Sequence, residues 1–130
     1  TDTVAVLLPG VSFFLNHTYA PARKLIEQNA IVAFATDYNP GSSHISSLSL
    51  IMSIAALKMN MTIEETISAV TINSAKALCR EKSIGSIEIG KKADFAVYNT
   101  QDYSDIVYSV GSNLNCMTMK NGKVIYQSAY

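Results

Sequence analysis

The sequence predicts an α/β fold followed by a smaller β-rich segment. Two short apolar runs, residues 4–8 and 31–35, have the length and the branched or aromatic content of buried strands. A helical segment separates them, so the three form a βαβ unit whose strands should be parallel neighbours with a right-handed connection. Short strand candidates and glycine-rich turns then replace the helical pattern, which divides the chain into residues 1–82 and 83–130.

Composition supports a folded chain and narrows its partners. Nearly half of the 130 residues are apolar, enough to bury a core. Ten acidic residues balance ten basic ones without clustering, so neither nucleic acid nor a membrane surface is expected as a partner. The longest apolar stretch, residues 48–57, is too short and polar for a membrane span. Cys79 and Cys116 lie far apart, which favours free thiols and a cytoplasmic location over a single disulfide.

The elements of the first part follow closely on one another. Pro9 and Gly10 should end the first strand, and residues 22–28 form a helix after Pro21. A longer helix is expected over residues 46–59, and the serines available to cap it are Ser42, Ser43 and Ser46.

Turn chemistry marks the remaining elements. Thr62 and Glu65 match a capping box at the start of a helix over residues 63–70. Another helix is expected over residues 73–79. The strands of the second part are predicted at residues 95–98, 115–119 and 124–127, and Asn121-Gly122 joins the last two as a hairpin.

Asp37 is the main candidate for chemistry. The apolar run that begins at Ile31 ends at this residue, and a carboxylate at the end of a buried strand is costly unless it is paired. In α/β barrels, catalytic and metal-binding residues lie at this end of the strands. Asp37 could bind a metal and act as a base toward water. The alternative is a structural residue in the turn that Asn-Pro-Gly forces.

Other polar residues near this turn are weaker candidates. Asn39, Gly41 and Ser42 could present an amide, a backbone N–H and a hydroxyl to a polar substrate, or could form an ordinary turn. His17 and His44 are the only histidines. One aspartate and two scattered histidines do not give the spacing of a metal site, so either there is no metal or its other ligands lie outside this chain.

Several motifs together resemble a known family. The stretch Ala35-Thr-Asp-Tyr-Asn-Pro-Gly41, the methionine-rich helix after it and residues 65–77 resemble the carboxyl-terminal part of the imidazolonepropionase family. Residues 84–97 are similar to the tail shared across the amidohydrolase superfamily. That tail is specific only for the superfamily, whereas the Asp-x-Asn-Pro-Gly turn narrows the resemblance to imidazolonepropionases.

The resemblance implies a fold and an activity. It implies the carboxyl-terminal part of a metal-dependent (β/α)8 barrel, with strands seven and eight at residues 4–8 and 31–36, plus part of a small composite β-sandwich. The implied reaction hydrolyses the cyclic amide of 4-imidazolone-5-propanoate to N-formimino-L-glutamate in histidine degradation, using one zinc or iron ion. Asp37 would bind the metal and take the proton of the attacking water, and Asn39, Gly41 and Ser42 would hold the small-molecule substrate. A cytoplasmic homodimer is expected.

The chain also departs from that family. Neither His17 nor His44 matches a metal-binding histidine of the family, and six barrel strands have no counterpart. We therefore expect a carboxyl-terminal fragment that is inactive alone and has open strand edges. Two alternatives stay open: another amidohydrolase, such as a purine-type deaminase, or a non-catalytic, self-associating α/β module.

Overall fold

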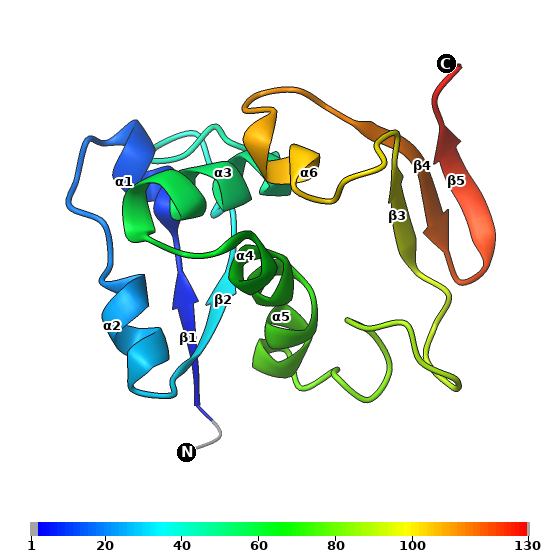
Figure 1. The fold of residues 1–130 in the computed structure, drawn as a ribbon, viewed down its shortest axis with the longest axis horizontal. Coiled ribbons are helices and arrows are strands. Elements are labelled where there is room, and N and C mark those ends of the chain that lie inside the picture. Colours follow the sequence, from blue (N-terminus) through cyan, green and yellow to red (C-terminus); the bar gives the residue numbers. More distant parts are fainter. Residues whose placement is uncertain (1–2, 130) are drawn as a thin grey trace.

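The computed structural model of the chain describes residues 3–129 (Figure 1). Helices dominate its first part, and a small antiparallel sheet follows. The elements in chain order are β1 (Val4–Leu7), α1 (Pro9–Phe14), α2 (Ala22–Glu27), β2 (Ile31–Phe34), α3 (Leu48–Met59), α4 (Ile63–Val70), α5 (Ile72–Ala77), β3 (Phe95–Tyr98), α6 (Asp105–Tyr108), β4 (Asn115–Lys120) and β5 (Lys123–Gln127).

Strands β1 and β2 form a parallel pair, as the βαβ pattern predicts. Val4 lies opposite Ile31, and the register continues to Leu7 opposite Phe34. In the view of Figure 1, α2 lies on one side of this pair and α4 and α5 on the other, and all three helices contact β2. The buried core they enclose consists of Ala22, Val32, Phe34, Ile51, Ala55, Met59, Met61 and Ala69. The mixed α/β class is therefore confirmed.

Strand β1 ends before Pro9, as predicted, and a helix that the sequence pattern did not indicate begins there. Pro9 occupies the first helical position of α1, where its missing N–H has no helical partner to lose. Gly10 follows and is buried. Helix α1 packs against α3 near the carboxyl ends of the two parallel strands (Figure 1).

Helix α3 begins later than the sequence pattern indicates. Its cap is Ser47, whose side chain accepts a hydrogen bond from the backbone N–H of Leu50 at 3.3 Å. The prediction of Ser42, Ser43 or Ser46 as the cap is therefore wrong. Several consecutive serines offer equivalent hydroxyls, and only the three-dimensional path of the loop selects one of them.

The predicted capping box of α4 is confirmed. The Thr62 hydroxyl accepts from the Glu65 backbone N–H at 3.2 Å, and the Glu65 carboxylate accepts from the Thr62 N–H at 2.8 Å. Helix α5 follows, and its side chains reach back to β2. Asn73 and Ser74 donate to the carbonyl oxygens of Val32 and Phe34 at 2.8 and 3.2 Å. We expected open strand edges, but this edge of β2 is covered by α5.

The last part is a three-stranded antiparallel sheet in the order β3-β4-β5. The predicted hairpin is confirmed: Asn121 and Gly122 have φ values of 48° and 75°, which a tight two-residue turn requires. The Asp94 carboxylate accepts from the Asn121 N–H at 2.8 Å and fixes this hairpin next to β3. The short helix α6, which no sequence signal announced, connects to α3 because Ser53 donates to the Val107 carbonyl oxygen at 2.6 Å.

Two further observations bear on the composition. Cys79 and Cys116 are both free thiols, as predicted. Within residues 3–129, none of the helices combines the length and apolar character needed to cross a membrane.

Candidate functional site

Asp37 lies beyond the end of β2, on the edge where the parallel strands β1 and β2 both end. Its backbone is left-handed, with φ of 48°. This conformation costs most residues about 1 kcal/mol or more, but aspartate and asparagine tolerate it better than others. Because β1 is parallel to β2, the start of α1 lies at the edge where β2 also ends (Figure 1).

The Asp37 side chain is exposed, and its carboxylate has no hydrogen bond or ion pair with any other residue that the structure describes. The premise that it closes a buried strand is therefore wrong, since β2 ends at Phe34 and the chain has emerged before residue 37. The carboxylate also caps none of the helices that the structure describes. Its backbone shapes the turn, while its side chain is available for chemistry.

Asn39 organises the turn instead. Its Nδ2 donates to the Asp37 carbonyl oxygen at 2.6 Å and to the Ser42 hydroxyl at 2.9 Å. Its Oδ1 accepts from the backbone N–H groups of Gly41 and Ser42 at 2.8 and 2.9 Å. The polar groups predicted to hold a substrate are thus bonded to one another here, and they would bind a ligand only by exchanging these bonds.

His44 lies in the same turn, as expected from its position. Its Nε2 is 3.0 Å from the Pro40 carbonyl oxygen, and its ring centroid lies 5.3 Å from that of Phe14 and 6.3 Å from that of Tyr38. These three exposed rings form a rim beside Asp37 that the sequence pattern did not reveal. His17 is exposed in the loop after α1.

A divalent metal does not fit the described residues alone. Residues 3–129 contain no group of three histidine, cysteine or acidic side chains placed to hold a metal ion. Asp37 supplies a single carboxylate, whereas a catalytic centre takes about three protein ligands. No chemical step is therefore assigned to a metal on these residues.

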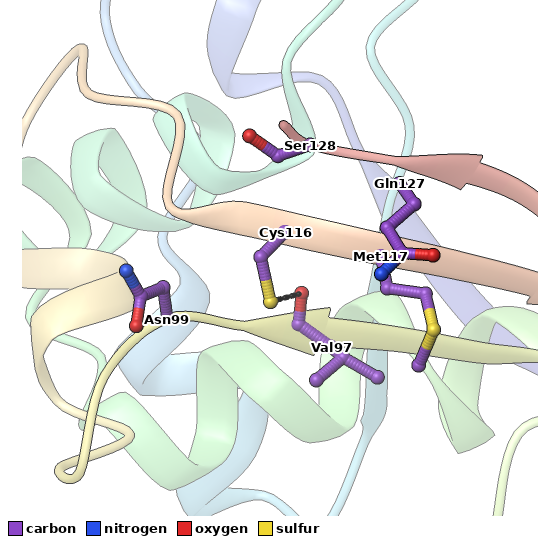
Figure 2. Close-up of a pocket in the computed structure, with 6 residues that line it drawn as sticks. All are labelled: Val97, Asn99, Cys116, Met117, Gln127 and Ser128. Carbon is purple, nitrogen blue, oxygen red and sulfur yellow. Dashed lines mark hydrogen bonds between the residues drawn. The ribbon is translucent and has the colours of Figure 1, made fainter. Parts of the chain in front are cut away.

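Two pockets in the described part of the chain lie away from Asp37. One of about 300 Å³ opens on the antiparallel sheet and is lined by Val97, Asn99, Cys116, Met117, Gln127 and Ser128 (Figure 2). The Cys116 thiol in it donates to the Val97 carbonyl oxygen at 3.4 Å, and its lining includes no charged side chain. A larger, mainly apolar pocket of about 780 Å³ lies between α4, α5 and β3. Lys92 and Asp94 are among the residues that line the larger pocket, and the Asp94 carboxylate is already bonded to Lys120 and Asn121. We locate the site at the Asp37 turn, where the carboxylate at the strand end makes no such bond within the described residues.

Comparison with protein families covers nearly the whole chain. The model of the amidohydrolase family matches residues 4–125, and the chain belongs to this family.

Within the amidohydrolase family, the chain is similar to curated imidazolonepropionases. An imidazolonepropionase from Geobacillus sp. (strain WCH70) is 49% identical over 125 residues, which cover 96% of this chain and 30% of that protein. An imidazolonepropionase from Porphyromonas gingivalis is 46% identical, and the match covers 99% of this chain and 30% of that protein. The chain thus spans about a third of the length of the curated relatives it matches.

Solved structures share the fold at lower identity. A zinc-bound adenosine deaminase from Xanthomonas campestris superposes with a TM-score of 0.83 at 23% identity, covering 93% of this chain and 31% of that one. Guanine deaminase from E. coli gives a TM-score of 0.80 at 16% identity, covering 98% and 35%. At such identities the likeness establishes an amidohydrolase fold and nothing about substrate.

Proposed function

We propose that these residues belong to a metal-dependent amidohydrolase that opens the ring of 4-imidazolone-5-propanoate to give N-formimino-L-glutamate. The observation that carries the proposal is the 49% identity to an imidazolonepropionase, over a stretch that includes the Asp37 turn. Residues 1–82 would then supply the last two strands of a (β/α)8 barrel, and residues 83–130 part of a β-sandwich.

Asp37 would act as the base in this reaction. Its exposed carboxylate lies at the strand edge that carries catalytic groups in α/β barrels. The carboxylate accepts a proton from water as the water oxygen attacks the ring carbonyl carbon. The ring C–N bond then breaks, and the departing nitrogen takes up a proton. Asn39, Gly41 and Ser42 would orient the substrate beside it.

The cofactor and the assembly are part of the same proposal. Zinc or iron would bind Asp37 together with ligands from outside these 130 residues. A cytoplasmic homodimer stays a prediction, and the exposed apolar side chains Leu78, Ile87 and Ile89 give such an association a surface to bury.

The test uses the full gene product that contains this sequence. Asp37→Asn is the informative variant, because asparagine keeps the shape and tolerates the left-handed backbone but cannot take the proton. We expect wild-type protein to hydrolyse 4-imidazolone-5-propanoate and Asp37→Asn to lose at least about a thousandfold in kcat. Activity of Asp37→Asn within a few-fold of wild type would sink the assignment.

A purine-type deaminase is the second candidate, favoured by the fold likeness to adenosine and guanine deaminases. Ammonia distinguishes the two reactions, because deamination releases it and ring hydrolysis of the imidazolone does not. Ammonia release from adenosine or guanine by the same preparation, without turnover of the imidazolone, would replace the first proposal. Absence of both activities in a well-folded, metal-supplied, self-associating protein would favour the non-catalytic module.

A further inference from the structure

We propose that Gly10 and Ser43 are positioning residues that together hold the backbone of Asp37 in its left-handed conformation. The inference rests on the proposed function, because it concerns how the Asp37 carboxylate is aimed. Neither residue touches the reacting atoms; both act through the chain on either side of Asp37.

The two peptide units that flank Asp37 are each held by a side chain. The Ser43 hydroxyl donates to the Thr36 carbonyl oxygen at 3.0 Å, which fixes the peptide unit before Asp37. The Asn39 amide donates to the Asp37 carbonyl oxygen at 2.6 Å, which fixes the unit after it. Because φ and ψ of a residue are rotations between its two flanking peptide units, these bonds set both angles of Asp37 and thus the direction of its Cα–Cβ bond.

Ser43 is itself rigidly placed. It is fully buried, and its carbonyl oxygen accepts from the Asn39 backbone N–H at 2.8 Å. A buried hydroxyl is a costly group to leave unpaired, so its bond to Thr36 is favoured over a bond to water. The Ser43 side chain therefore ties the end of the turn back to its beginning.

Gly10 lies next to the hydrogen bond between the Ser43 hydroxyl and the Thr36 carbonyl oxygen. A Cβ atom added at Gly10 would lie 3.1 Å from the Ser43 Oγ, 3.5 Å from the Thr36 carbonyl oxygen and 2.9 Å from Cδ1 of Ile51. Gly10 lies in the first turn of α1 with an ordinary helical backbone, so close packing rather than conformational freedom requires a glycine here. A glycine therefore leaves room for the Ser43 hydroxyl beside Thr36, at the point where the segment leaving β1 approaches the segment leaving β2.

Displacement of the carboxylate should affect the chemical step more than substrate binding. In the full gene product, we expect Ser43→Ala to lower kcat by about tenfold to a hundredfold, because small misplacements of a reacting group have effects of this size. KM should stay within about twofold, since the Asn39 bonds to the Gly41 and Ser42 N–H groups do not involve the Ser43 hydroxyl. Gly10→Ala should act in the same direction, because its methyl group would push the Ser43 hydroxyl away from Thr36.

The matched control is Ser46→Ala, which removes a hydroxyl from an exposed serine in the same loop and should leave kcat unchanged. Hydrogen–deuterium exchange of a peptide covering residues 36–43 gives a readout that does not depend on activity. Ser43→Ala and Gly10→Ala should lose protection in this peptide alone, whereas Ser46→Ala should not.

Three outcomes overturn the positioning role. These are an unchanged kcat in Ser43→Ala, a loss that appears mainly in KM, and a loss of exchange protection throughout the protein, which would indicate general damage. The Asp37→Asn variant distinguishes failure of the positioning role from failure of the proposed function. If Asp37→Asn stays active, the proposed function fails and the positioning role with it. If Asp37→Asn is inactive while Ser43→Ala and Gly10→Ala behave as wild type, only the positioning role fails.

Discussion

The side-chain amide of Asn73 donates to the carbonyl oxygen of Val32 at 2.8 Å, joining α5 to the middle of β2. The Ala35 N–H bonds to Leu7 on the β1 side, so by the alternation of a strand the carbonyl of Val32 faces away from β1. Val32 is buried, and its carbonyl would lack this donor without Asn73. The amide thus takes the place of a neighbouring strand at this edge of β2.

We predict that Asn73→Ala destabilises the fold by about 1–3 kcal/mol, because a buried carbonyl loses its donor. Asn99→Ala is the matched control, since the exposed Asn99 side chain makes no hydrogen bond with other residues in the described part of the chain. Chemical denaturation of both variants measures the difference. Equal free energies of unfolding would show that the Asn73 bond contributes nothing net.

The capping box of α4 gives a second prediction. Thr62→Ala removes the hydroxyl that accepts the Glu65 N–H, and we expect a loss of about 1 kcal/mol. Thr62→Ser keeps the acceptor and should restore most of the stability. A denaturation midpoint for Thr62→Ala equal to that of Thr62→Ser would contradict the role of the hydroxyl.

The same end of α4 should make stability depend on pH. Hydrogen bonds from the Arg23 guanidinium lower the pKa of the Glu65 carboxyl below its usual value, against a smaller opposite effect of burial. A carboxyl whose folded pKa is lowered binds its proton more readily when unfolded, so its contribution is complete above the unfolded pKa of about 4.3. We expect that contribution to disappear as the pH falls through the folded pKa.

Glu65→Gln tests this prediction, because glutamine can still accept from the Thr62 N–H but cannot titrate. Unfolding measured between about pH 3 and 7 should show a shallower loss of stability on acidification in Glu65→Gln than in wild type. Parallel curves would rule out a contribution of this carboxylate to the acid response.

Gly85 provides a prediction about packing. A Cβ at this residue would lie 2.7 Å from the Cβ of Ala75 and 3.0 Å from the Cα of Ile72, and φ is 95°. We expect Gly85→Ala to cost about 3 kcal/mol. Gly90→Ala is a close control, because Gly90 has φ of 92° and no atom within 4 Å of the added Cβ. The difference in unfolding free energy between the two variants isolates the steric overlap, and a difference near zero would argue against it.

Asn39 can be tested for its two roles in the full gene product. Asn39→Asp keeps an acceptor for the Gly41 and Ser42 N–H groups but loses the donor to Asp37, whereas Asn39→Ala loses both. We expect Asn39→Ala to lower kcat/KM by the equivalent of about 1–3 kcal/mol. A substrate-binding role should raise KM, whereas a role in shaping the turn should lower kcat. Unchanged kinetics in both variants would exclude either role.

Local sequence signals predicted the strand pair, a helix cap and a hairpin. The parallel pair followed from two apolar runs, and the α4 cap and the Asn121-Gly122 hairpin followed from turn chemistry at fixed spacing. Helix α1 was missed because Pro9-Gly10 is equally compatible with the end of a strand and the start of a helix.

The candidate site was only partly accessible to the same reasoning. The place of Asp37 after β2 could be predicted, because it depends on strand order alone. The contacts of Ser43 with Thr36 and Gly10 could not, since they join segments from two different strand ends and the local pattern shows only a run of serines. The sequence left Asn39 as either a substrate contact or part of an ordinary turn, and its hydrogen bonds inside the turn became evident only from the folded loop.

The left-handed backbone of Asp37 also affects how evolution can use this position. Two independent requirements restrict the residue at this position. The left-handed backbone favours aspartate, asparagine or glycine, and the proposed reaction requires a carboxylate. Glycine suits the left-handed backbone but has no carboxylate. Glutamate has the carboxylate but is disfavoured in this backbone conformation. An aspartate retained at this position across many proteins would therefore reflect the geometry of the turn as well as the chemistry it serves.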